Sequence, residues 1–465
     1  MKKRRLYYFA LTAMLLFINV SMAQTSPHIE GEVFVDLDTG LFTCSFTLSN
    51  VPRLTDFKVL LNKGMNIKHF KNGEGISLPY SGYYNPEIKG ESIAYVIKNK
   101  EGKENELPSQ FAIEYRGAFP KYNDSYNAFD FKGLIAINDK TLRATEQTKW
   151  YPVIYDVEKD KYINSYTYKI TIKTKEVETI FINGSAPKKT SSAMFSSSSP
   201  VPLLLFVGAY DYTSNRGNYI LNGNVGSETT AKVFENVRII QSFLEKKLDR
   251  EFTDNVYLIN HKAVNKRRKG SSWGFNTYPA FAFTGENFFG KIINKDGKFE
   301  DSRFRYFCHE FAHNYFGNNV QSGLLFWFWL ESFPEYLSFT FGEEVGGREY
   351  LKRIVKSKIK EVNKNTFLPL SKITEPDQVG GSYRYSMAPL ILLSFDFYFG
   401  RDTTYEVLKR LLTYADKETL TLAHFKKASL ASGVSNVKYK AFEKKFISND
   451  GFKQAVIDYL SKKFQ

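Results

Sequence analysis

Two histidines four residues apart flank a glutamate in the run His309-Glu310-Phe311-Ala312-His313. On a helix, residues four apart lie on one face, so both imidazoles can reach one metal ion while Glu310 stands beside it. Neutral imidazoles at this spacing favour zinc over calcium or magnesium. A zinc-bound water next to a carboxylate base is the chemistry of hydrolysis. The run therefore predicts a catalytic site for one zinc ion per chain.

A catalytic zinc site needs a third protein ligand and one open position for water. The next acidic residue along the chain is Glu331, and Glu335 follows one helical turn later. Pro334 requires a helix here to begin within about one turn upstream, because an interior proline blocks a backbone hydrogen bond. We therefore predict Glu331 as the ligand and Glu335 as an acceptor that orients a ligand imidazole. The alternative is that Glu335 binds the metal and Glu331 only favours the helix N-terminus.

The residues around the run support the helix that this geometry needs. Asp301 or Ser302 can cap its start, and Gly317 can end it. Cys308 directly precedes His309 and points about 100° away from the histidine face, so we expect it in the core. The opposite side of the helix would bury a set of aromatic residues: Phe304, Phe307, Phe311 and Tyr315.

The run, together with the later segment Trp329-Leu330-Glu331, resembles the aminopeptidase N type of gluzincin zinc metallopeptidases. The pattern of that family is HExxH followed by a Glu within a WLNEGF-like segment. Here the segment reads WLESFPEY, so the Asn before the Glu is missing and the spacing is one residue shorter. The resemblance implies a thermolysin-like catalytic domain in which the two histidines and Glu331 hold zinc and Glu310 is the general base.

Two further stretches carry the resemblance. Glu286 and Asn287 stand where the family has its GxMEN motif, whose Glu binds the free α-amino group of the substrate. The resemblance thus implies substrate binding for this pair, and an ordinary turn carboxylate is the alternative for Glu286. Residues 381–390 stand where the family has a YxKGA-like helix start, whose Tyr hydrogen-bonds the developing oxyanion. Tyr385 aligns best with that Tyr, Tyr383 is the alternate, and a core tyrosine is the remaining possibility.

The chain preceding this region has the pattern of an all-β domain, which we predict over residues 24–187. Between Phe42 and Leu48 apolar residues alternate with Thr and Ser, as in a half-buried strand. Asp38-Thr39-Gly40 supplies turn chemistry for a hairpin with residues 33–37. Further strands are predicted at residues 111–115, 133–137, 166–174 and 178–182.

A Ser-rich stretch, residues 188–200, is predicted as a linker. Residues 201–465 then have a mostly helical pattern, with a small sheet that begins at an apolar strand, residues 201–207. Helices are predicted at residues 229–248, 302–316, 330–341, 347–363, 386–399, 405–415, 422–432 and 451–464. The fold class is therefore multidomain α+β, with an N-terminal, sandwich-like β domain followed by a mostly α domain.

The composition is that of a folded protein. Of 465 residues, 43% are hydrophobic and 24% charged. Two cysteines, Cys44 and Cys308, exclude a disulfide-stapled scaffold and a thiolate-rich metal site. Two isolated histidines, His261 and His424, are predicted as structural or surface residues. The net charge of +15 is spread along the chain, so we expect a solvated basic face and no nucleic-acid partner.

The N-terminus has the features of a signal peptide, predicted as residues 1–23. Four basic residues at positions 2–5 precede a mostly apolar stretch, residues 6–20, and the small-x-small site Ser21-Met22-Ala23. An apolar stretch of this length is too short to span a bilayer comfortably, so we expect cleavage rather than a retained anchor. The mature protein would then be periplasmic or extracellular, without stable membrane insertion.

Together these features predict an exported zinc metallopeptidase that acts on peptides, most simply as an aminopeptidase. In the expected mechanism Glu310 takes a proton from the attacking water and delivers it to the leaving amine. Tyr385 would donate to the oxyanion, and Glu286 would anchor the N-terminal ammonium of the substrate. The alternatives are a zinc endopeptidase with an open cleft and a non-catalytic, peptidase-like surface or binding protein. The oligomeric state stays open.

Overall fold

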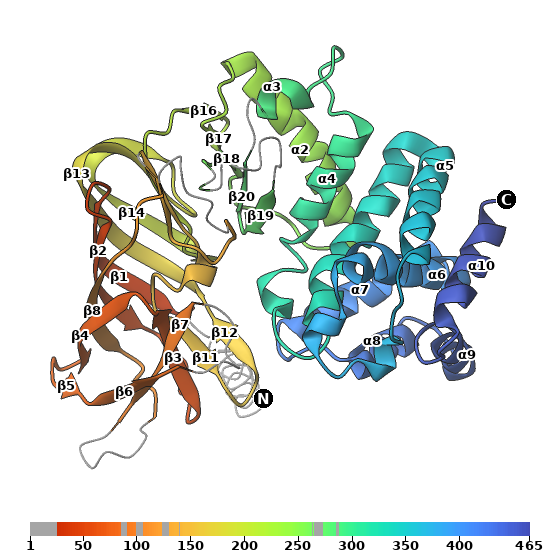
Figure 1. The fold of residues 1–465 in the computed structure, drawn as a ribbon, viewed down its shortest axis with the longest axis horizontal. Coiled ribbons are helices and arrows are strands. Elements are labelled where there is room, and N and C mark those ends of the chain that lie inside the picture. The colour runs from red at the N-terminus through yellow and green to blue at the C-terminus, as the bar shows by residue number, and fades with distance from the viewer. Residues whose placement is uncertain are drawn as a thin grey trace, which may run out of the picture.

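A computed structural model describes residues 26–465, apart from residues 85–90, 99–105, 123–129, 139, 263, 265–272 and 285–287. The predicted signal peptide and the candidate residues Glu286 and Asn287 therefore lie outside the described residues. Within the described part of the chain, no helix combines the length and the apolar character needed to cross a membrane. Figure 1 shows β-strands gathered in the N-terminal half and helices in the C-terminal half.

The N-terminal half is built from two β-sheets. The larger, ten-stranded sheet has the order β5-β4-β8-β2-β1-β13-β15-β10-β9, with β14 paired to β13. Its strands are β1 (His28–Asp36), β2 (Leu41–Ser49), β4 (Met65–Asn72), β5 (Ser77–Leu78), β8 (Phe111–Ala118), β9 (Ala136–Ile137), β10 (Thr141–Ala144), β13 (Ser165–Ile182), β14 (Lys188–Pro202) and β15 (Leu205–Gly208). The second sheet has the order β12-β11-β3-β7-β6. Its strands are β3 (Phe57–Asn62), β6 (Tyr80–Tyr83), β7 (Ser92–Ile97), β11 (Val153–Asp156) and β12 (Lys161–Ile163).

The alternating pattern of β2 places its apolar side chains in the domain core. Phe42, Cys44 and Phe46 are buried, and the ring of Phe42 lies 5.6 Å from that of the buried Trp150. β2 pairs antiparallel with β1 through the predicted turn, where Gly40 has φ 71°. This positive φ suits a residue without a Cβ. The predicted hairpin is confirmed.

The Ser-rich segment is not the predicted linker. It forms strand β14, which pairs antiparallel with β13 from Ser165↔Pro202 to Ile180↔Lys188. The next strand, β15, pairs with both β13 and β10, so the apolar strand that we predicted at the start of the helical domain belongs to the N-terminal sheet. The linker prediction failed because strand pairing uses backbone groups, and serine side chains suit a solvent-facing side. Phe195 and Val201, which are buried, are the apolar contacts of this strand.

The C-terminal half begins with a mixed, five-stranded sheet of order β16-β17-β18-β20-β19. Its strands are β16 (Tyr212–Asn215), β17 (Asn218–Leu221), β18 (Tyr257–Asn260), β19 (Gly274–Thr277) and β20 (Ala280–Phe283). The α-helices are α2 (Ser227–Leu248), α3 (Phe288–Ile292), α4 (Asp301–Ala312), α5 (Phe333–Asn363), α6 (Ala388–Phe399), α7 (Arg401–Ala415), α8 (Leu422–Ala431), α9 (Asn436–Phe446) and α10 (Phe452–Lys463). The predicted fold class, an all-β domain followed by a mostly α domain with a small sheet, is confirmed.

Most predicted helices correspond to an observed one. The two helices predicted at 330–341 and 347–363 correspond to α5 and the end of the π-helical turn before it, and within α5 Gly347 interrupts the helical backbone with φ 74° and ψ 178°. Helices α3 and α9 were not predicted. In α9 the buried residues Tyr439, Phe442 and Phe446 recur at helical spacing, so the signal was present among the many lysines of this segment.

The two halves share a hydrophobic cluster. Phe181 of β13 packs on Tyr257 of β18, with ring centroids 4.9 Å apart. Phe206 of β15 and Ile259 of β18 belong to the same buried cluster. The small sheet thus packs against the N-terminal sheet through side chains of its strands. This contact fixes the position of β19 relative to the N-terminal half.

Candidate metal centre

Helix α4 presents the two histidines on the side opposite its aromatic core contacts. Phe304, Phe307 and Phe311 are buried in the helical domain, as predicted. His313 is the C-cap residue directly after the helix and keeps helical backbone angles, and its backbone N–H donates to the carbonyl oxygens of Glu310 and Phe311. The predicted capping by Asp301 or Ser302 is wrong, because Glu300 is the N-cap and makes no side-chain cap hydrogen bond. Cys308 is buried, as expected for a core residue.

The structure brings His309, His313 and Glu331 together. Glu331 Oε2 lies 3.4 Å from His309 Nε2 and 3.6 Å from His313 Nε2. One donor atom from each of these residues lies within 4.8 Å of the others. Ligand atoms about 2.0–2.1 Å from a tetrahedral zinc ion lie about 3.3 Å apart, so both the spacing and the two-nitrogen, one-carboxylate donor set fit zinc.

Glu335 contacts the outer edge of His309. Its Oε2 accepts a hydrogen bond from His309 Nδ1 at 2.9 Å. Its Oε1 is held by Arg305 Nη1 and by Lys358 Nζ, each at 2.8 Å. Burial alone would raise the pKa of Glu335, but the hydrogen bond to His309 and the charges of Lys358 and Arg305 outweigh it and hold this pKa well below its usual range. Both oxygens of Glu335 are thus engaged by other side chains, whereas an oxygen of Glu331 faces the two histidines.

His313 is oriented by the backbone. Its Nδ1 lies 3.2 Å from the carbonyl oxygen of Phe316, which can accept a hydrogen bond from the ring. A proton held at Nδ1 leaves the Nε2 lone pair directed toward Glu331 and the metal position. Each of the two imidazoles therefore has an acceptor at Nδ1 and a free nitrogen facing the other ligands.

Two candidate residues lie in π-helical turns. Glu331 lies in the turn Phe328–Ser332, directly before α5, and Tyr385 lies in the turn Tyr383–Met387, directly before α6. Such turns are rare and frequently occur at functional sites, because the wider turn redirects side chains. Tyr385 lies close enough to Glu331 for that carboxylate to raise the pKa of its hydroxyl, and its ring centroid lies 5.9 Å from that of His309.

The alternate tyrosine does not reach the metal ligands. Tyr383 is buried, and its hydroxyl donates to the carbonyl oxygen of Leu368 at 2.9 Å. Tyr385 instead lines the same cleft as His309 and Glu310. Burial, together with the negative charge of Glu331, raises the pKa of Tyr385 well above its usual range, so its hydroxyl keeps its proton.

Glu310 has the environment of a general base. Only 8% of its surface is exposed. Burial raises the pKa of Glu310 to about 7, and the charge of Glu331 acts in the same direction, against the opposing charges of His309 and Lys132. A carboxyl group with a pKa near neutrality can both accept and return a proton at physiological pH.

These residues lie at a cleft of about 600 Å³ between the two halves of the chain. The N-terminal half contributes Lys132, Gln147, Ser165, Pro200 and Pro202 to its lining. The C-terminal half contributes β19, Tyr278, Trp327 and the metal-site residues. Lys358, Arg305 and Lys132 were not among the predicted site residues, because the basic residues of the chain were expected on a solvated face. The helical spacing of α5 places Lys358 on the same side as its buried residues. In the sequence, however, a lysine at such a position cannot be told apart from one on the surface.

The comparisons with known proteins concern the fold. No protein-family model and no curated protein matches this chain. The native yeast LTA4 hydrolase superposes with a TM-score of 0.60 at 14% identity, over 90% of this chain and 67% of that one. The M1 zinc metallopeptidase from Deinococcus radiodurans gives a TM-score of 0.59 at 12% identity, over 94% of both chains. The chain has the fold of these proteins. A mutant of the Deinococcus enzyme bound to a Tyr-Ser-Ala substrate superposes with a TM-score of 0.56 at 13% identity, over 93% of both chains.

Proposed function

We propose that this chain is a zinc metallopeptidase that removes N-terminal residues from peptides. The observation that carries the proposal is the convergence of donor atoms from His309, His313 and Glu331 within 4.8 Å of one another. Glu310 lines the same cleft, which is large enough for a peptide. The M1 zinc metallopeptidases with this fold, one of them bound to Tyr-Ser-Ala, support peptides as the substrate class.

The residues of the site have separate roles in this proposal. His309, His313 and Glu331 would hold the ion, which would supply a Lewis acid and lower the pKa of water toward about 7. Glu310 accepts a proton from the attacking water and returns it to the leaving amine. Glu335 keeps His309 in the tautomer and orientation that ligation needs.

Tyr385 stabilises the oxyanion that forms as water attacks the carbonyl. We expect Tyr385→Phe to lower kcat by about 100-fold, because a preorganised donor to an oxyanion contributes roughly 3 kcal/mol. KM and zinc content should change little, since the ring stays in place. Tyr383→Phe, two residues away, is the matched control, because it removes a hydroxyl that donates to the backbone carbonyl oxygen of Leu368. Equal losses in the two variants would contradict the assignment.

The aminopeptidase specificity rests on the sequence resemblance at Glu286 and Asn287. We expect wild-type protein to hydrolyse peptides with a free α-amino group and to act far more slowly on the same peptides N-acetylated. Glu286→Ala should reduce kcat/KM for free peptides by about 100-fold and for acetylated peptides much less, because an ion pair to the ammonium is lost. Equal hydrolysis of free and acetylated peptides would instead favour an endopeptidase with an open cleft.

The export of the protein rests on residues 1–23. The basic start, the apolar stretch and the small-x-small site support a secreted or periplasmic enzyme. Zinc analysis of the purified protein, together with the panel of free and acetylated peptides, tests the proposal as a whole. A zinc-free protein without peptidase activity would identify a non-catalytic, peptidase-like binding protein.

A further inference from the structure

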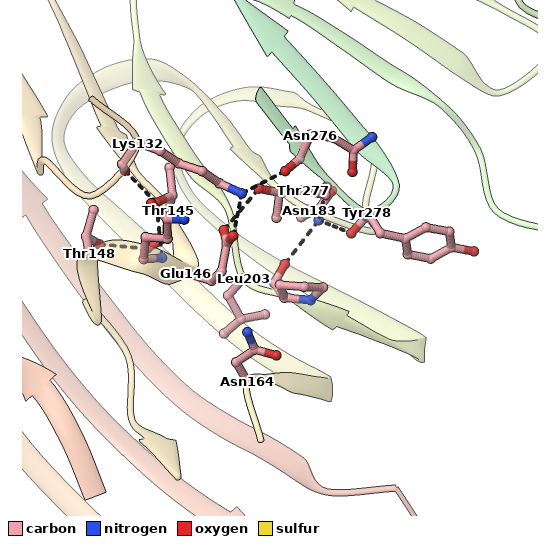
Figure 2. A network of polar contacts seen from close by, with 12 residues as sticks. Lys132, Thr145, Glu146, Thr148, Asn164, Asn183, Leu203, Asn276, Thr277 and Tyr278 are labelled. Atoms are coloured by element: carbon pink, nitrogen blue, oxygen red, sulfur yellow. Dashed lines mark hydrogen bonds and ion pairs between the residues drawn. The ribbon is translucent and has the colours of Figure 1, made fainter. Parts of the chain in front are cut away.

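A lysine from the N-terminal half reaches into the cleft beside the metal site. Lys132 lies before β9, and its Nζ donates to the backbone carbonyl oxygen of Asn276 in β19 at 2.7 Å. The same Nζ forms an ion pair with Glu146 Oε1 at 2.5 Å. Figure 2 shows the ammonium between the Glu146 carboxylate and the strand that carries Asn276 and Thr277. No motif or spacing pattern in the sequence points to these residues.

The carboxylate of Glu146 lies behind the ammonium. Its side chain is 1% exposed, whereas that of Lys132 is 15% exposed and lines the cleft. Glu146 Oε2 accepts a hydrogen bond from Thr277 Oγ1 at 3.0 Å (Figure 2). Thr145 Oγ1 donates to the backbone carbonyl oxygen of Lys132 at 2.7 Å, which holds the lysine segment in place. A molecule in the cleft can therefore contact the cation of this pair but not its anion.

Among the described residues, one other cationic side chain, Arg250, lines the cleft, and its ion-pair partner is exposed rather than buried. Arg250 pairs with Asp416 at 2.7 Å, and both side chains are accessible, at 34% and 47%. The Arg250 charge is thus offset by an anion at the same surface. The counter-charge of Lys132 is buried, so the ammonium is the accessible member of this ion pair.

The ammonium of Lys132 is also a hydrogen-bond donor. A lysine ammonium has three N–H groups. Within the described part of the chain, Lys132 Nζ donates one hydrogen bond to Asn276, pairs with the Glu146 carboxylate and lies over the ring of Phe275, 5.3 Å from its centroid. Lys132 lines the same cleft as Glu310 and His313. The accessible part of its side chain is therefore in the cleft where a substrate would lie.

We propose that Lys132 is a specificity-determining residue that binds a carboxylate of the peptide substrate. This carboxylate belongs either to an acidic side chain or to the C-terminus of a short peptide. A charge-assisted hydrogen bond, formed where the buried Glu146 holds the ammonium in place, favours a carboxylate over an amide of the same shape. The proposal rests on the proposed peptidase function for its substrate class.

Two matched pairs of peptides distinguish the two sources of the carboxylate. Ala-Ala-Ala-Ala is compared with its C-terminal amide, and Ala-Ala-Glu-Ala amide is compared with Ala-Ala-Gln-Ala amide. In one of the two pairs, we expect wild-type protein to hydrolyse the peptide with the carboxylate with a kcat/KM about tenfold higher than that of its amide partner. This is the effect of one hydrogen bond to a charged group. We expect this preference to fall below about twofold in Lys132→Met.

Two further variants separate substrate binding from a structural role. The double variant Lys132→Met with Glu146→Gln leaves no unpaired buried carboxylate, so it should fold and show the same loss of preference. Lys161→Met is the matched control. Lys161 also belongs to the N-terminal half, and its Nζ donates across to the carbonyl oxygen of Ala415 at 2.6 Å, but it does not line the cleft. This control should keep the wild-type preference.

The binding of the same peptides to zinc-loaded Glu310→Gln protein, measured by calorimetry, makes the two proposals separable. One outcome is that Glu310→Gln protein binds the carboxylate peptides more tightly and loses this preference when Lys132 is also replaced, while wild-type protein hydrolyses none of the peptides. This outcome would support the role of Lys132 and overturn the peptidase function. Hydrolysis without a preference in either pair, or a preference that persists in Lys132→Met, would overturn the role of Lys132. A preference lost equally in Lys161→Met would show that the lysine acts only through the contact between the two halves.

Discussion

Replacing Glu310 by Gln is expected to abolish peptide hydrolysis and to leave zinc bound. Gln has nearly the same volume as Glu but cannot accept a proton, so kcat should fall by about 10³-fold, the usual contribution of a general base. Zinc should remain, because Glu310 supplies none of the three donor atoms that converge at the site. Zinc content by atomic absorption and single-turnover hydrolysis of an unblocked peptide measure the two effects separately.

The matched control for this experiment is Glu344→Gln. Glu344 is a carboxylate of α5 that pairs with Lys247 at 3.5 Å, and it does not line the cleft. It should keep wild-type activity, so that any loss in the Glu310 variant reports on the base rather than on a general loss of charge. Undiminished hydrolysis by Glu310→Gln would refute the proposed mechanism.

The second large effect concerns the third metal ligand. We expect Glu335→Gln to weaken zinc binding by about 10- to 100-fold, because it disturbs only the partner that orients His309. Glu331→Gln should weaken it by more than this range, since the variant removes a ligand oxygen that lies between the two histidines. Competition with a chromophoric chelator at constant pH gives both dissociation constants.

The order of these two effects is the decisive result. A larger loss in Glu335→Gln than in Glu331→Gln would restore the alternative in which Glu335 is the ligand. Thermal unfolding of both apoproteins is the control, because Glu335 also holds Arg305 and Lys358. A cation left without its partner in a half-buried position destabilises the fold and would lower zinc binding indirectly.

Much of the architecture could be predicted from local patterns. The alternation of β2 and the helical spacing of α2 predicted their elements, because the side that each buries is a property of neighbouring residues alone. The Ser-rich strand β14 could not be predicted in this way. Its partner, β13, supplies the backbone hydrogen bonds, and few side chains of β14 are buried.

The choice between Tyr383 and Tyr385 could not be made from the sequence. The two residues are separated by a single position, and either could be aligned with the same motif. The π-helical turn directs Tyr383 to the carbonyl oxygen of Leu368 and leaves Tyr385 beside Glu331. The wider turn depends on packing around the start of α6, which no periodic pattern reports.

The sequence by itself determined that His309, Glu310 and His313 share one region of a helix, because helical geometry follows from residue spacing. Only the tertiary structure decided that Glu331 lies between the histidines, that Glu335 lies behind His309, and that Lys132 enters the cleft from the other half of the chain. Such contacts join segments that are distant along the chain. Their geometry depends on how whole elements pack against one another, which spacing within one element cannot specify.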